Sequence, residues 1–571
     1  MKHSLLTITF SLLFLAANAQ IPSFDWAVQL GDTSSGLFVL STTTDHEGSV
    51  YSTGVLTGTI DFDPGAGIDT MTDHGFGDVF IFKLDSSGVF QWAKRIGEES
   101  YDQASSITVD AANNIYVTGF FSRDSTDFDP GAGTFYLPNP NGGASTFILK
   151  LDSNGNFVWA KSLGADSNSP SSIALDANEN ILLTGIFGGT VDFDPGSGAE
   201  LLTALSADIY ILKLTSNGDF IRVKQIDATT TNSKAFSIAS GMSGAMYLTG
   251  LLLGTVDFDP GIGVANLSST SQFGAEFILK LDSTGNFMWA KVINGDISQT
   301  GGDRAILVDA AENLYTAGWF DHTVDFDPNS GVNTLTVSVS EPASTYLLKL
   351  DSSGNFIRAI QIGDGADGSY RSIALDHAGN LFVAGKFLSV GDFDPGPAID
   401  TLSIATGNRF IAKYDSSGAL DWAFNFSNSN FTDDHNTCLS IDDAGNIIAT
   451  GVFNGVADFD PGMGTYNLSS LSSSAFFILK LNPDNFSGII NPSASNQNIF
   501  VYPNPSAGEF RVRVNTKGAL SLYSPLGQLL QTFLVNSGVE EIIFTPDLPN
   551  GVYFLKFDDD PSEIANVIIL N

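Results

Sequence analysis

The chain has 571 residues, of which 43% are hydrophobic and 11% aromatic, so it is long enough to bury large hydrophobic cores. Its 63 acidic and 25 basic residues give a formal net charge of −38. Because nucleic acids and anionic membranes both require a basic protein surface, this charge argues against them as partners and favours cations as small ligands.

The N-terminal 19 residues have the pattern of a cleavable secretory signal. Lys2 precedes an apolar stretch over residues 5–17, and Ala17 and Ala19 precede Gln20. We expect cleavage between Ala19 and Gln20. The apolar stretch is short for a membrane span, and the rest of the sequence contains no candidate transmembrane helix. We interpret the single cysteine, Cys438, as a small buried apolar side chain in an exported protein without an internal disulfide.

Residues of about 24 to 482 repeat one unit of 65 to 68 residues seven times. The most regular part of the unit is the pentapeptide Asp-Phe-Asp-Pro-(Gly/Asn), which starts at Asp61, Asp127, Asp192, Asp257, Asp325, Asp392 and Asp458. A glycine that closes a short apolar run precedes it by seven residues, or by eight in one copy. Self-similarity at such a period is typical of propellers and solenoids.

Each unit contains four short segments rich in β-branched and aromatic residues, for example 147–152, 157–161, 172–176 and 181–185. Tight turns rich in Asn and Gly separate them. No window after the N-terminus places apolar residues at helical spacing, so the predicted fold class is all-β. Seven equal four-stranded sheets are arranged most economically around an axis, and we therefore predict a seven-bladed β-propeller.

The two ends of the repeat array complement each other. The array begins with the Trp-containing strand alone, residues 24–28, and ends with the strand that precedes it in every unit, residues 476–481. We predict that the N-terminal strand is the outermost strand of blade 7, which closes the ring over residues 20–484 and removes an open edge. In two blades the Trp position holds Arg222 and Arg358, which an outer strand tolerates because the stem covers apolar surface while the head stays in water.

A stretch rich in Ser, Asn and Pro, residues 485–498, is typical of a linker and separates the repeats from a domain at residues 499–571. Three segments of this domain resemble, in order, the C-terminal sorting domain of type IX secretion substrates: residues 501–508, 522–527 and 548–556. The resemblance implies a small β-sandwich that the type IX machinery recognises at the outer membrane of a Gram-negative bacterium and usually removes on export. The chain departs from such tails at residues 567–571, which contain no basic residue, so its removal stays open.

The repeats resemble the bacterial seven-bladed β-propeller repeat family, SBBP, with residues 110–119 as the clearest copy. That family implies the same fold and carries no general activity. The segment 152–159 is also similar to the Asp boxes of sialidase propellers and to the Trp-docking repeats of quinoproteins, although its Asp-to-Gly spacing differs by one residue from each. Both of these motifs are structural hairpin signatures, so they imply no catalytic role.

The pentapeptide carries the candidate site residues. In an extended segment its two aspartates point to one side and its Phe to the other. Pro and the following Gly or Asn would form the centre of a type II turn, capped by the second Asp, with the first Asp solvated. The alternative is a Ca²⁺ site, because hard cations take oxygen ligands, although the loop lacks the third Asp and the distal Glu of an EF-hand-like loop. We predict the turn, and the ligands of the alternative Ca²⁺ sites would be Asp61, Asp63, Asp127, Asp129, Asp192, Asp194, Asp257, Asp259, Asp325, Asp327, Asp392, Asp394, Asp458 and Asp460.

The pentapeptide lies between the second and third strands of each unit. Because successive strands alternate in direction, this connection should fall on the face of the links between blades, opposite the short turns that join the first to the second strand and the third to the fourth. We therefore expect the acidic pairs to form a ring on one rim of the propeller.

No catalytic pattern accompanies the repeats. The sequence contains no phosphate-binding loop, nucleophile elbow or HExxH motif. Its six histidines, which we interpret as turn or surface residues in no repeated position, include His46, His74, His322, His377 and His435. We predict an exported monomer without catalytic residues that serves ligand binding, adhesion or surface structure, with an unknown glycan or protein as its ligand. The alternative is a secreted hydrolase or lyase that acts on polysaccharide through acidic residues from separate blades.

Overall fold

The computed structural model divides the chain into two compact units, Ser23–Asp484 and a unit that contains Met1–Pro22 and Asn485–Asn571, and each is described by itself. The structure describes residues 21–31, 36–122, 125–139, 143–164, 167–228, 232–295, 297, 306–337, 343–364, 372–387, 390–396, 399–402, 409–426, 437–462, 464–470, 475–482, 499–502, 509–514, 517–523, 529–535, 540–544, 551–557 and 564–569. The predicted signal peptide, its cleavage site at Ala19 and Gln20, the linker 485–498 and His435 lie outside these residues.

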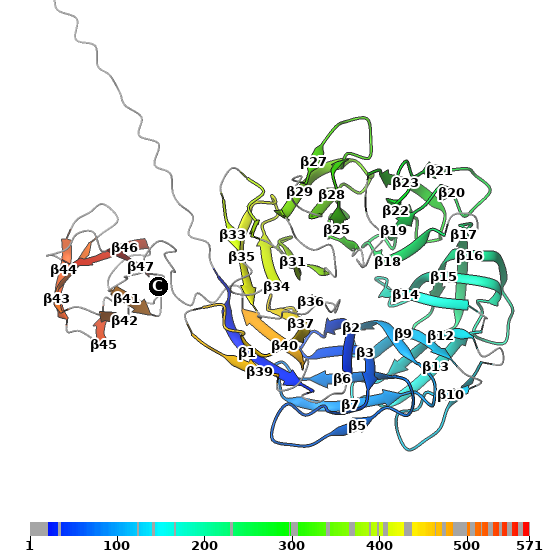
Figure 1. Cartoon of the computed structure of the whole chain (residues 1–571), viewed down its shortest axis with the longest axis horizontal. Coiled ribbons are helices and arrows are strands. Elements are labelled where there is room, and N and C mark those ends of the chain that lie inside the picture. Colours follow the sequence, from blue (N-terminus) through cyan, green and yellow to red (C-terminus); the bar gives the residue numbers. More distant parts are fainter. Residues whose placement is uncertain are drawn as a thin grey trace, which may run out of the picture. The chain divides into compact units, whose positions relative to one another are not determined.

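Ser23–Asp484 forms the predicted seven-bladed propeller, with four antiparallel strands in each blade (Figure 1). Blade 1 contains β2 (Gly36–Thr44), β3 (Val50–Thr57), β6 (Asp78–Leu84) and β7 (Phe90–Ile96). Blade 2 contains β8 (Gln103–Val109), β9 (Ile115–Ser122), β12 (Ala144–Leu151) and β13 (Phe157–Leu163). Blade 3 contains β14 (Ser167–Leu175), β15 (Ile181–Asp192), β16 (Leu201–Leu214) and β17 (Phe220–Ile226).

The remaining four blades follow the same order. Blade 4 contains β18 (Lys234–Ser240), β19 (Met246–Leu252), β22 (Ala275–Leu281) and β23 (Phe287–Ile293). Blade 5 contains β24 (Ile306–Val308), β25 (Leu314–Phe320), β28 (Ser344–Leu350) and β29 (Phe356–Asp364). Blade 6 contains β30 (Ser372–Leu375), β31 (Leu381–Lys386), β34 (Arg409–Tyr414) and β35 (Leu420–Phe426). Blade 7 contains β36 (Cys438–Ile441), β37 (Ile447–Phe453), β40 (Ala475–Asn482) and β1 (Ser23–Leu30).

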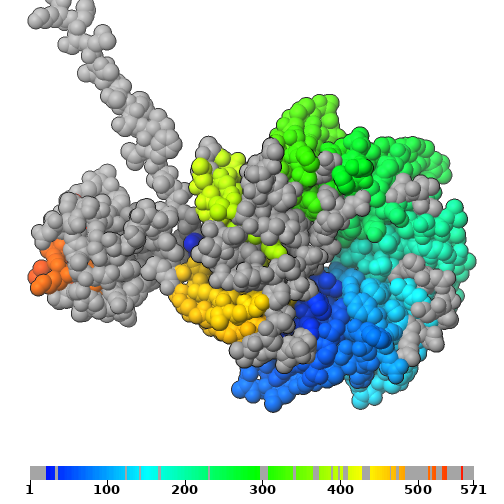
Figure 2. Space-filling model, in the orientation of Figure 1, coloured from blue at the N-terminus to red at the C-terminus, as the bar shows by residue number. Residues whose placement is uncertain are grey.

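The predicted closure of the ring is confirmed. The N-terminal strand β1 pairs antiparallel with β40, from Ser23 opposite Asn482 to Leu30 opposite Phe476. The blades follow one another in sequence order around the ring, so that the first and the last blades are neighbours (Figures 1 and 2). The last blade is therefore held together by strands from both ends of the repeat array.

The hydrophobic core lies between the blades. The second and third strands of blade 1, β3 and β6, are buried on both faces, whereas the outermost strand β7 is mostly half-buried. This explains why the third strand of every unit is an almost continuous apolar run, since both of its faces are covered by neighbouring blades. Cys438 in β36 is buried, as predicted.

In blades 1 to 4 the glycine that precedes the pentapeptide is required by a β-bulge in the innermost strand. In blade 1 the register shifts between Val39 and Ser41, which brings the carbonyl of Phe38 against Gly54. A Cβ atom on Gly54 would lie 1.8 Å from that carbonyl oxygen, and one on Gly119 or Gly250 would lie 2.0 Å from the corresponding oxygen. No other residue fits such a close backbone approach.

The pentapeptides sit at the tips of short two-stranded ribbons that lie at the periphery of the ring (Figure 1). The ribbons are β4 (Thr59–Asp61) with β5 (Thr70–Thr72), β10 (Ser125–Asp127) with β11 (Tyr136–Pro138), β20 (Thr255–Asp257) with β21 (Asn266–Ser268), β26 (Thr323–Asp325) with β27 (Thr334–Thr336), β32 (Gly391–Asp392) with β33 (Thr401–Leu402), and β38 (Val456–Asp458) with β39 (Asn467–Ser469). In blade 3 the ribbon is continuous with β15 and β16.

The predicted position of the pentapeptides on the rim opposite the short turns is wrong, because each ribbon folds back along the outermost strand of its blade. In blade 7 the base of the ribbon meets the end of β1, where Gln29 Nε2 donates to Ser469 O at 3.0 Å. Nearer the tip, the rings of Tyr466 and Phe24 lie 4.6 Å apart at the start of β1. The tips therefore reach the side of the molecule that carries the turns between the third and fourth strands.

The C-terminal unit contains two antiparallel sheets. One consists of β41 (Ile499–Tyr502), β42 (Glu509–Val514) and β45 (Glu540–Phe544), and the other of β44 (Leu529–Val535), β43 (Gly518–Tyr523), β46 (Gly551–Phe557) and β47 (Ile564–Ile569). Val512, Leu520 and Leu555 are buried in it. No helix among the described residues is long and apolar enough to cross a membrane.

Candidate functional site

The aspartates of the pentapeptide fix the main chain of the ribbon tip. In blade 3, Asp192 Oδ1 accepts the N–H of Asp194 at 3.0 Å and that of Glu200 at 2.8 Å, while Asp194 Oδ1 accepts the N–H of Gly196 at 2.8 Å. The same three hydrogen bonds recur in the other six copies. The Phe between the two aspartates is fully buried in every copy, as predicted.

Two details of the predicted turn are wrong. The first aspartate is not simply solvated, because it accepts two main-chain N–H groups. The turn is not of type II either, since neither Gly196 nor Asn329 has a left-handed φ. The cap by the second aspartate is confirmed: the tip is an Asx turn, in which the side chain of Asp194 replaces a main-chain acceptor. Among the described residues no three His, Cys, Asp or Glu side chains are grouped so that they could hold a metal ion. The seven Ca²⁺ sites stay the untested alternative to the predicted turn.

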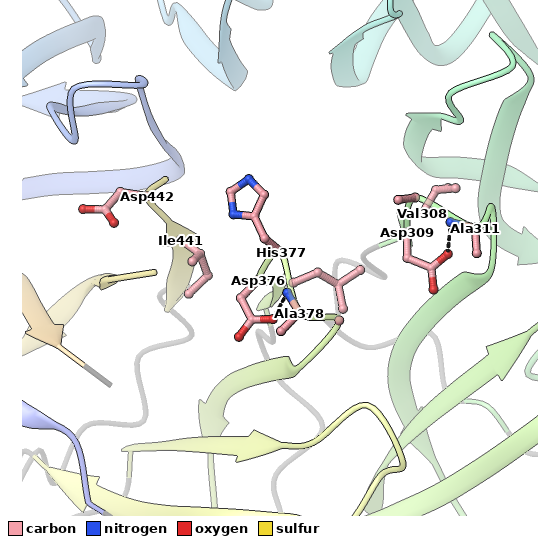
Figure 3. Close-up of a pocket in the computed structure, with 11 residues that line it drawn as sticks. Val308, Asp309, Ala311, Asp376, His377, Ala378, Ile441 and Asp442 are labelled. Carbon is pink, nitrogen blue, oxygen red and sulfur yellow. Dashed lines mark hydrogen bonds between the residues drawn. The ribbon is translucent and has the colours of Figure 1, made fainter. Parts of the chain in front are cut away.

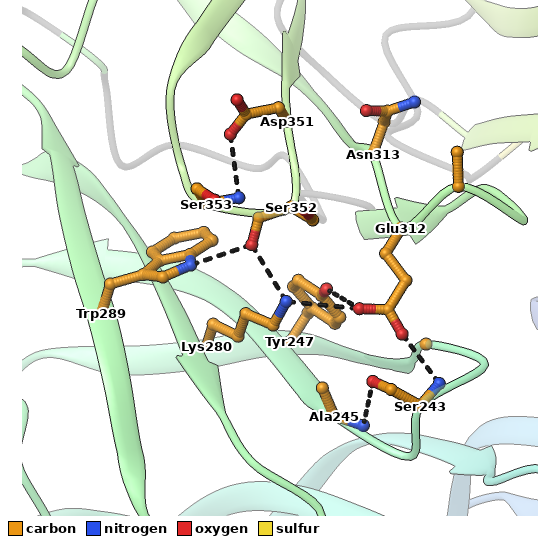
Figure 4. Close-up of polar contacts among 12 residues, drawn as sticks. Ser243, Ala245, Tyr247, Lys280, Trp289, Glu312, Asn313, Asp351, Ser352 and Ser353 are labelled. Carbon is orange, nitrogen blue, oxygen red and sulfur yellow. Dashed lines mark hydrogen bonds and ion pairs between the residues drawn. The ribbon is translucent and has the colours of Figure 1, made fainter.

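A second repeated constellation joins most blades to the next. In blade 4, Trp289 Nε1 and Lys280 Nζ both donate to the carbonyl of Ser352, in the turn between the third and fourth strands of blade 5, at 3.2 Å and 2.9 Å (Figure 4). The ammonium of Lys280 also lies 4.8 Å above the ring of Tyr247. Two side chains of blade 4 thus donate to one carbonyl of blade 5, and the lysine also covers the ring of Tyr247.

The arginines at the Trp position take over this docking. The guanidinium of Arg222 donates to Ser283 O at 3.3 Å and that of Arg358 to Ser416 O at 3.0 Å. The prediction that the guanidinium stays in water therefore missed the hydrogen bond that it donates to the next blade. The turn glycine that faces the docking side chain, such as Gly354, has φ +76°, and a Cβ atom there would lie 3.1 Å from the indole of Trp289.

In most blades the lysine equivalent to Lys280 pairs with the aspartate that begins the turn between the first and second strands of its own blade. Lys213 Nζ lies 2.7 Å from Asp176 Oδ2. Burial acts to raise the pKa of Asp176, but hydrogen bonds from Lys213 and Asn180 outweigh it and hold the pKa below its usual value. The charges are therefore engaged within the scaffold rather than held ready for a substrate.

The same turns surround a hollow at the axial mouth of the propeller. Its volume is about 440 Å³, and it is lined by the turns that follow the first strands of blades 5, 6 and 7. The imidazole of His377 points into the open centre, whereas the carboxylates of Asp309 and Asp376 accept the turn N–H groups of Ala311 and Ala378, both at 2.9 Å (Figure 3). The hollow is concave but offers few uncommitted polar groups.

Two histidines occupy equivalent positions at this mouth, so the interpretation that no histidine position is repeated is wrong. His46 in blade 1 and His377 in blade 6 each follow the first aspartate of their turn. His46 Nδ1 lies 2.7 Å from Asp443 Oδ2 of blade 7. The hydrogen bond and the charge of Asp443 raise the pKa of His46, so that this pair links the first and last blades more strongly when the imidazole is protonated.

Comparison with known protein families supports both parts of the chain. The model of the secretion system C-terminal sorting domain matches residues 500–571, and that of the β-propeller repeat SBBP matches residues 91–119. An uncharacterized WD repeat-containing protein of Acanthamoeba polyphaga mimivirus is 23% identical over 504 residues, which cover 75% of this chain. The chain spans 36% of the length of that relative.

Two solved structures with a similar course of the chain have low sequence identity to it. The β-propeller domain of Cps50 (Swd1) from Myceliophteria thermophila is 9% identical, with a TM-score of 0.34 over 73% of this chain and 96% of that one. Sqt1 from Chaetomium thermophilum is 10% identical, with a TM-score of 0.36 over 81% of this chain and 100% of that one. Within the chain, residues 91–119 match an SBBP propeller repeat and residues 500–571 match a secretion C-terminal sorting domain, which indicates a protein secreted from or displayed on a Gram-negative bacterium.

Proposed function

We propose that this exported propeller is a non-enzymatic binding protein whose ligand is an extracellular glycan or protein. The observation that carries the proposal is the engagement of the repeated carboxylates. The aspartates of all seven ribbon tips accept main-chain N–H groups, and so do those at the axial mouth. A glycoside hydrolase instead needs two carboxyl groups that face one cleft, about 5 to 10 Å apart.

Asp102, a carboxylic acid with a strongly raised pKa, supports the same proposal. Burial raises the pKa of Asp102 to about 7, which lies in the range of catalytic acids. Asp102 is nevertheless only 1% exposed, and its two oxygens accept the N–H groups of Ser122 and Glu98 at 3.1 and 3.2 Å. A group buried in this way fixes two loops and does not reach a polysaccharide.

The experiment is a combined binding and turnover assay on the exported chain. We expect retention on at least one immobilised polysaccharide or matrix protein, without release of new reducing ends or unsaturated sugars over a day at 25 °C. Release of such products would instead establish the secreted hydrolase or lyase.

We also propose that residues 20–484 fold as one domain and that residues 485–498 link them to the sorting domain, residues 499–571. The separate clustering of Ser23–Asp484 supports this boundary. Residues 20–484 produced alone should be soluble and show the melting curve of the propeller in the full mature chain. An insoluble fragment beside a stable full chain would contradict the boundary.

A further inference from the structure

One surface breaks the near-symmetry of the blades. On the face of the links between blades, the segment 74–78, which leads into β6, lies against the segment 97–102, which leads from blade 1 into blade 2. The N–H of Phe76 donates to Ser100 O at 3.4 Å, and the N–H of Asp102 donates to Gly77 O at 2.9 Å. Main-chain hydrogen bonds thus join the two segments.

Two aromatic side chains stand out from this pair of segments. Phe76 is 80% exposed and Tyr101 is 40% exposed. The ring of Tyr101 lies against the backbone of Gly77, where a Cβ atom would be 3.2 Å from the ring, and 5.9 Å from the half-buried ring of Phe120. Tyr101 and Phe120 therefore lie side by side, and Phe76 stands on the segment that main-chain hydrogen bonds join to that of Tyr101; we call these three residues the aromatic platform.

Two buried carboxylates, those of Asp78 and Asp102, fix the main chain of the segments that carry the platform. Asp78 Oδ2 accepts the N–H of His74 at 2.9 Å and the guanidinium of Arg95 at 2.5 Å. Asp102 fixes Glu98 and the end of β9 in the same way. Burial raises the pKa of both acids, which shows that their burial is costly. What this arrangement achieves is a rigid backbone beneath aromatic rings that remain in solvent.

We propose that the aromatic platform binds the flat face of a neutral saccharide. This proposal rests on the proposed binding function and names the ligand class. Aromatic faces attract the C–H groups on one face of a pyranose ring, just as they attract the positive edge of another aromatic ring. The hydroxyl of Tyr101 donates to Gln103 Oε1 at 2.7 Å, so these two polar groups lie beside the rings and can exchange hydrogen bonds with sugar hydroxyls.

The net charge of the chain and the small size of the platform favour a neutral saccharide over anionic polysaccharides and proteins. The net charge of −38 repels anionic polysaccharides. Three partly exposed rings present a few hundred Å² at most, whereas a stable protein partner covers roughly 800 Å² on each side. A platform whose main chain is already fixed by hydrogen bonds loses less freedom on binding and suits a ligand of one to three sugar rings.

Blade 4 offers a matched control. Phe273 is 48% exposed and precedes Gly274 at φ +105°, as Phe76 precedes Gly77 at φ +140°. The sequence that follows β23, residues 294–305, contains no aromatic residue, and the side-chain oxygen of Asn294 accepts the N–H of Thr270 at 2.9 Å. Phe273 is thus an exposed Phe in a similar loop without a platform.

The test compares the mature wild-type chain with Phe76→Ala, Tyr101→Ala and Phe273→Ala by affinity electrophoresis in soluble laminarin, xyloglucan, mannan and amylose. We expect wild-type retardation in at least one of them. Phe76→Ala and Tyr101→Ala should each weaken it about tenfold, equal to about 1.4 kcal/mol, and Phe273→Ala should change it less than twofold. The melting temperatures of Phe76→Ala and Phe273→Ala should stay unchanged, because both side chains are exposed, whereas Tyr101→Ala loses ring contacts and should melt at a slightly lower temperature.

Each contrary outcome is distinct. No retardation of the wild type in any of the four polysaccharides, or equal retardation of wild type and Phe76→Ala, overturns the saccharide platform and leaves the proposed binding function in place. Binding to immobilised fibronectin or collagen that Phe76→Ala abolishes assigns the platform to a protein instead. Breakdown of a polysaccharide by the wild type overturns the non-enzymatic function and not the platform.

Discussion

The carboxylate of Glu312 in blade 5 lies 3.3 Å from the ammonium of Lys280 in blade 4. Blade 4 has Gly241 where most other blades have the aspartate that pairs with this lysine. A side chain from the next blade therefore supplies the missing charge. Burial acts to raise the pKa of Glu312, but hydrogen bonds from Ser243, Lys280 and Tyr247 outweigh it and lower the pKa to about 2.

Glu312→Gln should lower the free energy of unfolding by about 2 to 3 kcal/mol at pH 7. The value lies below the 3 to 5 kcal/mol of a fully buried broken pair, because Glu312 is partly exposed. Urea denaturation measures it. Gly241→Asp in the Glu312→Gln background should recover part of the loss, since it restores the arrangement of the other blades. If Glu312→Gln alone is as stable as the wild type, the cross-blade pair contributes nothing.

The same pair predicts a pH dependence. Since the pKa of Glu312 is depressed in the folded state, its contribution is present above the unfolded value of 4.5 and is lost as the pH falls through about 2. The difference in unfolding free energy between the wild type and Glu312→Gln should therefore shrink between pH 4.5 and pH 2. A difference that stays constant over this range would show that the ionised carboxylate is not its source.

Trp289→Phe should cost about 1 kcal/mol through the loss of the hydrogen bond to Ser352 O. Trp159→Phe is the matched control, because the buried Nε1 of Trp159 has no hydrogen-bond partner among the described residues. It should be neutral or slightly stabilising. The two variants are compared by thermal and urea unfolding, and equal losses would mean that the indole acts only by its bulk.

Removal of β1, residues 23–30, should lower the melting temperature of the mature chain substantially. The deletion exposes the edge of β40 and uncovers Phe476, which β1 pairs with and helps to bury. Addition of a synthetic peptide of residues 21–31 should restore part of the loss. An unchanged melting curve after the deletion would contradict the closure of blade 7.

The double change Asp192→Asn and Asp194→Asn distinguishes a turn from a Ca²⁺ site. An amide oxygen can accept the same main-chain N–H groups, so the blade should stay folded and Ca²⁺ should alter its melting little before or after the change. If each tip binds Ca²⁺ instead, a hundredfold excess over the dissociation constant adds about 2.7 kcal/mol per site. Calorimetry that finds tight binding, reduced by one site in the double variant, would establish the metal.

The sequence alone determined the architecture. Seven copies of the pentapeptide defined the unit, and the half-units at residues 24–28 and 476–481 predicted which strand closes the ring. These inferences depend on local patterns, because strand alternation and turn residues are encoded within a few positions. The buried Phe of each pentapeptide followed from the same alternation.

Only the tertiary structure decided how the units contact one another. The fold-back of each ribbon depends on packing against an outer strand, as in Tyr466 on Phe24, between residues more than 400 positions apart. The partner of Trp289 is a main-chain carbonyl, which leaves no side-chain signature in the sequence. Lys280 is neutralised by Glu312 because the neighbouring turn happens to pass within reach. Such contacts join different blades, and their geometry is fixed only when the ring closes.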